Sequence, residues 1–122
     1  MSTKYGGKGG SIVNLSSGAA KYGSPGEYVD YAASKAAIDT LTIGLAREVA
    51  EEGIRVNAVR PGFIDTEIYQ SGGEPDRMER VHSLVPMKRV GQAEEVADAI
   101  MWLLSDKASY TTGTILDVSG GR

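Results

Sequence analysis

The sequence predicts an α/β fold with a parallel sheet of about three strands joined by crossover helices. Short apolar runs alternate along the chain with longer segments in which apolar residues recur every three or four positions. Clusters of glycine separate these segments and mark the loops between them. The resulting order of strand, helix, strand, helix and strand is typical of parallel sheets whose connections cross over through helices.

The first half of the chain predicts one strand and one long helix. Residues 12–15 are mostly apolar and lie between a glycine run and Ser-Ser-Gly, which is typical of a buried strand. Residues 27–52 predict the helix, and Gly53 follows its last turn as a stop signal. Four apolar residues of this helix step by three and four positions and are expected to share one face: Ile38, Leu41, Leu45 and Val49.

The second half predicts two more strands and a helix. Residues 54–59 predict a strand that ends at Arg-Pro-Gly, and residues 114–118 predict another that ends before Ser-Gly-Gly. Residues 92–105 predict a helix, because its apolar residues share a face and two glutamates stand in its first turn. Residues 63–90 are irregular, apart from a short helix expected over residues 76–84.

Composition limits the classes of function. A chain of 122 residues holds one domain at most, and its net charge of −3 gives no reason to expect a nucleic-acid partner or an anionic membrane surface. The absence of cysteine excludes disulfides, a thiolate nucleophile and cysteine-based zinc sites, and we expect no metal site. No stretch approaches the roughly 20 apolar residues of a membrane span, and the first residues do not resemble a signal peptide. We therefore expect a cytoplasmic protein.

Tyr31 and Lys35 are candidate catalytic residues. Their spacing of four places both side chains on one face of the long helix, about 6 Å apart along its axis. A nearby ammonium group favours the phenolate form of a tyrosine, which can take a proton from an alcohol or return it to a forming alkoxide. Taken without its context, the pair is weak evidence and is more typical of a solvated helix face.

Ser17 stands at the end of the first predicted strand, fourteen residues before Tyr31. Ligand chemistry gathers at the carboxyl ends of strands in open α/β sheets. A serine hydroxyl there can bind a substrate oxygen and stabilise charge as it develops. The alternative is that Ser16 and Ser17 only cap the turn before Gly18.

Four blocks of the sequence resemble the short-chain dehydrogenase/reductase family. They are Ile-Val-Asn-Leu-Ser-Ser at 12–17, Tyr-Ala-Ala-Ser-Lys at 31–35, Ile-Arg-Val-Asn-Ala-Val-Arg-Pro-Gly at 54–62, and the closing strand at 115–121. The blocks follow the order and the spacing of that family and cover nearly the whole chain. The resemblance implies an oxidoreductase that interconverts an alcohol and a carbonyl compound by hydride transfer.

The resemblance also assigns roles to the candidate residues. Tyr31 is expected to be the general acid/base, while Lys35 stabilises its phenolate and holds the nicotinamide ribose. Ser17 is expected to orient the substrate oxygen and is preferred to Ser16, because the second serine of this pair is the usual catalytic one in the family.

Cofactor contacts follow from the resemblance as well. Pro61 and Gly62 would shape the turn beneath the nicotinamide of NAD or NADP, and Ile64 and Thr66 would hold its carboxamide. Residues 67–90 resemble the substrate lid of the family. The nature of the substrate and the choice between NAD and NADP are left open.

The family's N-terminal cofactor-binding half is expected to be missing. The resemblance implies a partial Rossmann-like, doubly wound parallel sheet, but no glycine-rich turn opens a helix after a strand, and Gly6 to Gly10 precede one. The full-length protein is expected to form a homo-oligomer, dimer or tetramer. A truncated, inactive fragment that serves only as an oligomerisation module is the alternative. The extended relatives that modify nucleotide sugars are disfavoured, because only 91 residues follow Tyr31.

Overall fold

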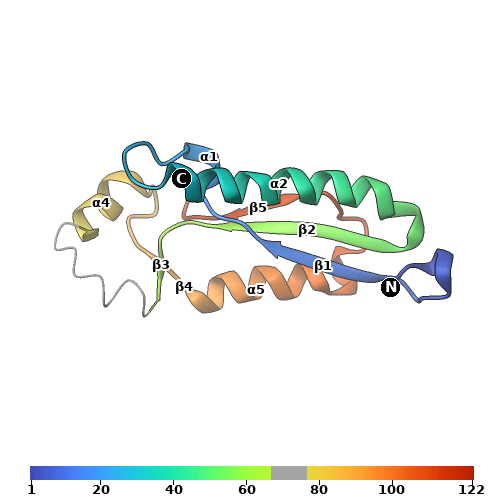
Figure 1. Cartoon of the computed structure of the whole chain (residues 1–122). Helices are drawn as coiled ribbons and strands as arrows, with labels where there is room; N and C mark the ends of the chain where they lie inside the picture. Colours follow the sequence, from blue (N-terminus) through green and yellow to red (C-terminus); the bar gives the residue numbers. More distant parts are fainter. Residues whose placement is uncertain (67–76) are drawn as a thin grey trace.

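Three parallel strands form a sheet in the order β1-β2-β5 (Figure 1). The structure is a computed structural model and describes residues 1–66 and 77–122. The strands are β1 (Gly10–Leu15), β2 (Ile54–Pro61) and β5 (Ile115–Val118). The three predicted strands are therefore confirmed, each within a few residues of its expected bounds.

The register of the sheet brings the three strands to a common edge. Leu15 at the end of β1 is level with Val59, and Pro61 at the end of β2 is level with Val118. Because the strands are parallel, the segments that follow them leave the sheet on the same side. This edge is where an open α/β sheet binds its ligands.

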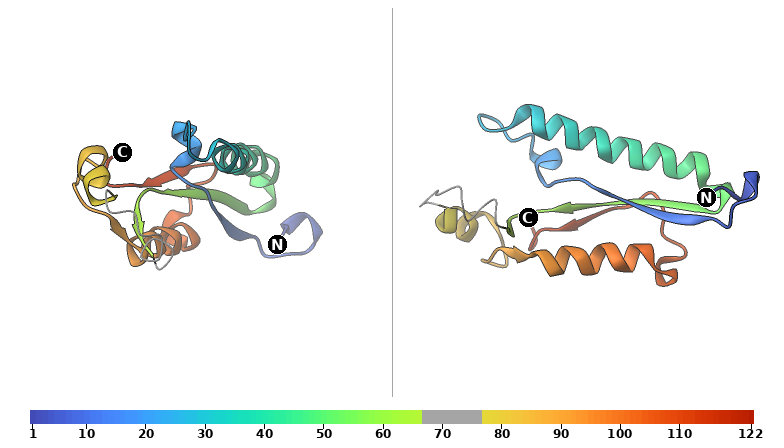
Figure 2. Two further views of the ribbon diagram at one scale, coloured as in Figure 1. Left: turned by 60° about the vertical axis from the view of Figure 1, so that its left-hand side comes forward. Right: turned by 60° about the horizontal axis from the view of Figure 1, so that its bottom comes forward.

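Two long helices cover opposite faces of the sheet, as Figures 1 and 2 show. They are α2 (Val29–Val49) and α5 (Ala93–Leu104). Helices on both faces bury the central strand, so that Val56, Ala58 and Val59 are fully buried. This arrangement confirms the predicted doubly wound α/β architecture.

The buried face of α2 differs from the predicted one. Its fully buried side chains are Ala32, Thr42 and Ala46, whereas Leu41 is 56% exposed. Of the four apolar residues expected to share one face, Leu41 therefore lies outside the part that the sheet covers. Small side chains allow the helix to approach the sheet closely, and Thr42 Oγ1 accepts a hydrogen bond from Asn14 Nδ2 at 3.0 Å.

The remaining elements are short. The predicted C-terminal end of the long helix is a 3-10 helix. Gly53, in a left-handed conformation with φ of 75°, caps it by donating its N–H to the Ala50 carbonyl. One pair of two-residue strands was not predicted, because two residues carry no periodicity. The short elements are η1 (Thr3–Tyr5), α1 (Ala19–Tyr22), η2 (Ala50–Glu52), β3 (Ile64–Asp65), α4 (Arg77–Leu84), β4 (Gly91–Gln92) and η3 (Asp106–Ala108).

The segment from α4 to β4 packs against the loop after β5. Val81 and Val85 are buried, and the Met87 N–H donates to the Gly120 carbonyl at 3.0 Å. A side chain at Gly120 would collide with Val85, since an added Cβ would lie 2.7 Å from its Cγ1. Val81 and Val85 thus serve packing, whereas Leu84 is exposed, and the side chain of Met78 lies outside the described part of the chain.

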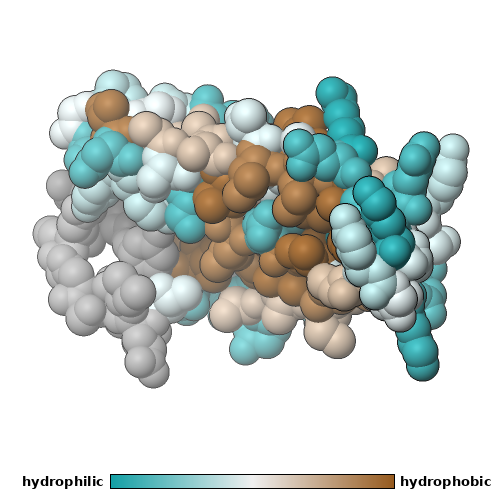
Figure 3. Space-filling model, turned by 45° about the vertical axis from the view of Figure 1, so that its right-hand side comes forward, coloured by the Kyte–Doolittle hydropathy of each residue, from teal (hydrophilic) through white to brown (hydrophobic). Residues whose placement is uncertain are grey.

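Apolar surface gathers along the edge of the sheet that β1 forms. Figure 3 shows hydrophobic residues over β1 and on the flanking sides of α2 and α5. Leu15 in β1 is 54% exposed, and Trp102 in α5 is 45% exposed. Within residues 1–66 and 77–122, no helix has both the length and the hydropathy that crossing a membrane requires.

Candidate active site

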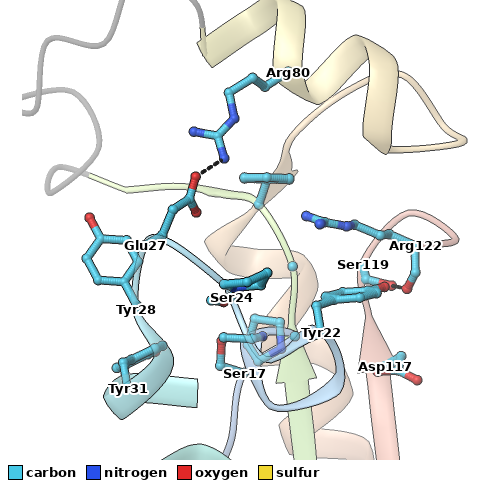
Figure 4. Close-up of a pocket in the computed structure, with 16 residues that line it drawn as sticks. Ser17, Tyr22, Ser24, Glu27, Tyr28, Tyr31, Arg80, Asp117, Ser119 and Arg122 are labelled. Atoms are coloured by element: carbon cyan, nitrogen blue, oxygen red, sulfur yellow. Dashed lines mark hydrogen bonds and ion pairs between the residues drawn. The ribbon is translucent and has the colours of Figure 1, made fainter. Parts of the chain in front are cut away.

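A pocket of about 840 Å³ opens at the carboxyl edge of the sheet (Figure 4). Its wall is built from the segments that follow the three strands and from the N-terminal end of α2. Its volume lies in the range of small-molecule sites. The lining residues include Ser17, Tyr22, Glu27, Tyr28, Tyr31, Pro61, Gly62, Phe63, Arg80, Asp117, Ser119 and Arg122.

The two serines at the end of β1 have different environments. Ser16 is buried, and its hydroxyl donates to the Lys35 carbonyl at 3.3 Å, which ties the strand end to α2. Ser17 lines the pocket, and its Oγ accepts a hydrogen bond from the Ala19 N–H at 3.1 Å. That hydroxyl keeps its proton for a further acceptor, whereas the Ser16 proton is already used.

Tyr31 and Lys35 lie on the same side of α2. The Lys35 ammonium is 5.8 Å from the centre of the Tyr31 ring, which is a cation–π distance. Lys35 Nζ also donates to the Leu15 carbonyl at 3.1 Å, so the end of β1 holds the lysine in position. Tyr31 is 46% exposed and lines the pocket together with Ser17.

Pro61 and Gly62 form the part of the pocket wall that follows β2. The Pro61 carbonyl accepts a hydrogen bond from Gly18 N at 3.0 Å, and Gly62 N donates to Val118 O at 3.0 Å. An added Cβ at Gly62 would lie 3.0 Å from the Cα and Cβ of Ser119. The three strand ends thus meet too closely here for a side chain.

Ile64 and Thr66 lie beyond this wall, outside the residues that line the pocket. Ile64 is 7% exposed and belongs to β3, where it pairs with Gly91 of β4. Thr66 is half-buried and is the last described residue before residues 67–76. The structure therefore brings Ser17, Tyr31 and Gly62 to one pocket and leaves Ile64 and Thr66 at its margin.

Charged residues of the pocket were not predicted from the sequence. Arg80 of α4 reaches Glu27, with Nη2 at 2.8 Å from Oε1, and Figure 4 shows this pair crossing one side of the pocket. Asp117 of β5 is bound by Arg60, and Arg122 extends into the pocket from the loop after β5. Of these charged residues, only Arg122 could have been noticed from the sequence, because it follows the end of a predicted strand, where ligands bind in open α/β sheets.

The comparisons with known proteins identify the family of the chain. A family model described as enoyl-(acyl carrier protein) reductase matches residues 2–122. The chain belongs to the short-chain dehydrogenase/reductase family. The matched residues contain every candidate site residue.

Individual relatives of the family cover the same region. The uncharacterized oxidoreductase YgfF of Escherichia coli (strain K12) is 69% identical over 122 residues, which are 100% of this chain and 49% of that protein. The 3-oxoacyl-[acyl-carrier-protein] reductase FabG of Thermotoga maritima is 46% identical over 93% of this chain and 46% of its own length. The chain thus spans about half the length of these curated relatives.

A solved structure of the family shows the same fold. The 3-oxoacyl-[acyl-carrier protein] reductase of Brucella melitensis with bound NAD superposes with a TM-score of 0.81 at 44% identity, over 91% of this chain and 40% of that one. The predicted partial Rossmann-like fold is confirmed by this agreement.

The residues of this short-chain dehydrogenase/reductase fit one end of a nicotinamide cofactor. Gly62 lines the pocket with backbone alone, at the point where it lies close to Ser119, so a flat ring can approach the chain there. The Lys35 ammonium lies beside Tyr31, where hydroxyl groups of a ribose would find a donor. Within residues 1–66 and 77–122, no glycine-rich turn leads from a strand into a helix to hold the pyrophosphate, so the fit concerns the nicotinamide end.

Proposed function

We propose that this protein is an NAD(P)-dependent oxidoreductase that interconverts an alcohol and a carbonyl compound. The observation that carries the proposal is the common pocket of Ser17 and Tyr31, with the Lys35 ammonium beside the tyrosine ring. As a carbonyl oxygen becomes an alkoxide, it needs a proton donor, a hydrogen bond from a hydroxyl group and a cation near the proton donor. Tyr31, Ser17 and Lys35 would supply these three groups in that order.

Proton transfer is assigned to Tyr31. When bound, the cofactor supplies the hydride in reduction or takes it up in oxidation. In reduction the Tyr31 hydroxyl gives its proton to the substrate oxygen, and in oxidation the phenolate takes the proton of the alcohol. Lys35 stabilises the phenolate that remains after the transfer, since its ammonium group is held next to the ring by the Leu15 carbonyl.

Substrate orientation is assigned to Ser17. Its Oγ already accepts the Ala19 N–H, which leaves the hydroxyl proton to be donated into the pocket. A hydrogen bond from this hydroxyl to the substrate oxygen strengthens as that oxygen gains charge. Because Ser17 stands in a fixed turn, less conformational entropy is lost when its hydroxyl is ordered against the substrate oxygen.

The nicotinamide end of the cofactor is assigned to residues after β2 and to the catalytic pair. Tyr31 and Lys35 would contact the ribose, and Pro61, Gly62, Ile64 and Thr66 the nicotinamide and its carboxamide. We further propose that residues 67–90 act as the substrate lid. Within the described part of this lid, Arg80 reaches the pocket and pairs with Glu27.

The second candidate function is that of an oligomerisation module without catalysis. Exposed apolar residues of β1 and α5 favour it, among them Leu15, Met101 and Trp102, because apolar surface of this kind commonly marks an interface. We propose that the full-length protein is a homo-oligomer under either function. The two candidates differ in whether Tyr31 has a chemical role.

Replacement of Tyr31 by Phe in the full-length gene product tests the proposal. We expect kcat for reduction of a panel of aldehydes and ketones with NADH and NADPH to fall about 10²- to 10⁴-fold, because general acid catalysis is lost. Tyr28→Phe is the matched control, since Tyr28 lines the same pocket and has no lysine four residues later. Retained activity in Tyr31→Phe contradicts the assignment. A wild-type protein that reduces no member of the panel with either cofactor supports the oligomerisation module.

A further inference from the structure

The pocket contains one cation that no acidic side chain neutralises within the described residues. Its two carboxylates already have partners: Glu27 binds Arg80, and Asp117 binds Arg60 through both oxygens. Arg122 has no ion pair with a carboxylate in residues 1–66 and 77–122. Among the described residues, the Arg122 guanidinium is therefore left without a carboxylate partner in a pocket whose other charged side chains form ion pairs.

Arg122 is held in place by contacts that involve no acidic side chain. Its guanidinium carbon lies 4.3 Å from the centre of the Tyr22 ring and 5.3 Å from that of Phe63. Its carbonyl accepts hydrogen bonds from Lys21 Nζ at 3.3 Å and from Ser119 Oγ at 3.1 Å. The side chain is thus positioned before a ligand arrives, which lowers the entropic cost of binding.

Stacking leaves the N–H groups of a guanidinium available. A ring contact uses the flat face of the group, whereas its five N–H bonds lie in the plane. An edge of the plane matches the two oxygens of a carboxylate and forms two parallel hydrogen bonds. Figure 4 shows Arg122 extending into the pocket from the loop after β5, while Tyr31 enters from α2.

We propose that Arg122 binds a carboxylate of the substrate, so that the substrate is an oxo or hydroxy compound with a carboxylate remote from the reacting carbon. This proposal rests on the proposed function and adds the chemical class of the substrate. A single unpaired guanidinium matches the single negative charge of a carboxylate. A phosphate monoester carries nearly two negative charges at neutral pH and would be neutralised only in part.

The test uses the full-length gene product and matched pairs of substrates. These are straight-chain methyl ketones of increasing length that end in a carboxylate, together with their methyl esters, which lack only the charge. We expect Arg122→Gln to lower the acid-to-ester ratio of kcat/KM by about 10- to 100-fold, the usual effect of losing a charge-assisted hydrogen bond. Arg47→Gln is the matched control, because Arg47 is exposed on α2 outside the pocket, and should leave the ratio unchanged.

Each outcome bears on one of the two proposals. Equal use of acids and esters by the wild type, or an unchanged ratio in Arg122→Gln, overturns the carboxylate assignment while turnover itself upholds the proposed function. Preference for a phosphorylated ketone, with the same dependence on Arg122, overturns it in favour of a phosphate. If the wild type turns over neither these ketones nor any member of the aldehyde and ketone panel, the proposed function fails. Calorimetric titration with the same acids and esters then decides on the carboxylate site: tighter binding of acids that Arg122→Gln abolishes supports it, and equal binding overturns it.

Discussion

Arg60 at the end of β2 and Asp117 in β5 form a two-point salt bridge. Arg60 Nε lies 2.9 Å from Asp117 Oδ1, and Nη2 lies 3.2 Å from Oδ2. The remaining Nη1 is 3.5 Å from Oδ2 of Asp39 in α2. The hydrogen bond to Asp117, more than any other cause, raises the pKa of Arg60 above its ordinary value. One guanidinium therefore ties α2 to β2 and β5 next to Pro61.

Arg60→Met and Asp117→Asn are predicted to be non-additive. Removal of the guanidinium leaves the carboxylates of Asp117 and Asp39 without their shared partner, which we expect to lower the free energy of unfolding by about 1–3 kcal/mol. In a double-mutant cycle measured by urea denaturation, residues in direct contact should couple by about 0.5–3 kcal/mol. Additive effects of the two changes would show that the salt bridge contributes no stability of its own.

Substitution of Ser17 is predicted to affect catalysis, whereas substitution of Ser16 is predicted to affect stability. Ser17→Ala should lower kcat in the full-length protein about 10²-fold or more, because its hydroxyl faces the pocket, with a small change in Tm. Ser16→Ala should instead lower the free energy of unfolding by about 1 kcal/mol, because its buried hydroxyl donates to the Lys35 carbonyl. Steady-state kinetics and thermal unfolding of both variants check this. A larger loss of kcat in Ser16→Ala would reverse the assignment of the catalytic serine.

Glu95 is predicted to make the stability of α5 depend on pH in the acid range. Its hydrogen bonds to Arg89 and to the Gln92 N–H lower the pKa of Glu95 to about 2. A lowered pKa means that the carboxylate stabilises the folded state fully above the ordinary value of about 4.3 and that this contribution is lost as the pH falls towards 2. The difference in unfolding free energy between the wild type and Glu95→Gln should therefore shrink between pH 6 and pH 2.

Urea denaturation at several pH values measures this difference. Glu94→Gln is the matched control, because Glu94 stands in the same helical turn and forms no ion pair in the part of the chain that the structure describes. A difference for Glu95→Gln that stays constant down to pH 2 would mean that the bonds to Arg89 and Gln92 do not form in solution.

The long elements of the fold were predictable because each carries enough residues to show a period. The strands and the two covering helices, α2 and α5, follow from apolar spacing and from glycine stops. The paired strands β3 and β4 have two residues each and leave no such signal. The exposure of Leu41 could not be predicted, because spacing alone does not show that alanines and Thr42 are the side chains of α2 buried against the sheet.

The candidate site was predictable where it depends on local geometry. Tyr31 and Lys35 share a helix face because of their fixed spacing, and Ser17 directly follows a strand. Each of these two features can be recognised within a single segment of the sequence. The pocket charges depend instead on segments that only the tertiary fold brings together. Arg80 and Glu27 are 53 residues apart in sequence, and no local pattern links them.

The 122-residue chain by itself is predicted to self-associate and to bind NAD or NADP weakly or not at all. In the described structure β1 pairs only with β2, so its other edge offers free backbone groups beside exposed apolar residues such as Leu15 and Trp102. Sedimentation should show a mass that rises with concentration, and Leu15→Lys combined with Trp102→Lys should reduce it. Tyr110→Lys removes a more exposed aromatic residue after η3 and is the control. A monomer at all concentrations, or micromolar binding of either cofactor in a calorimetric titration, would show that β1 needs no further neighbour.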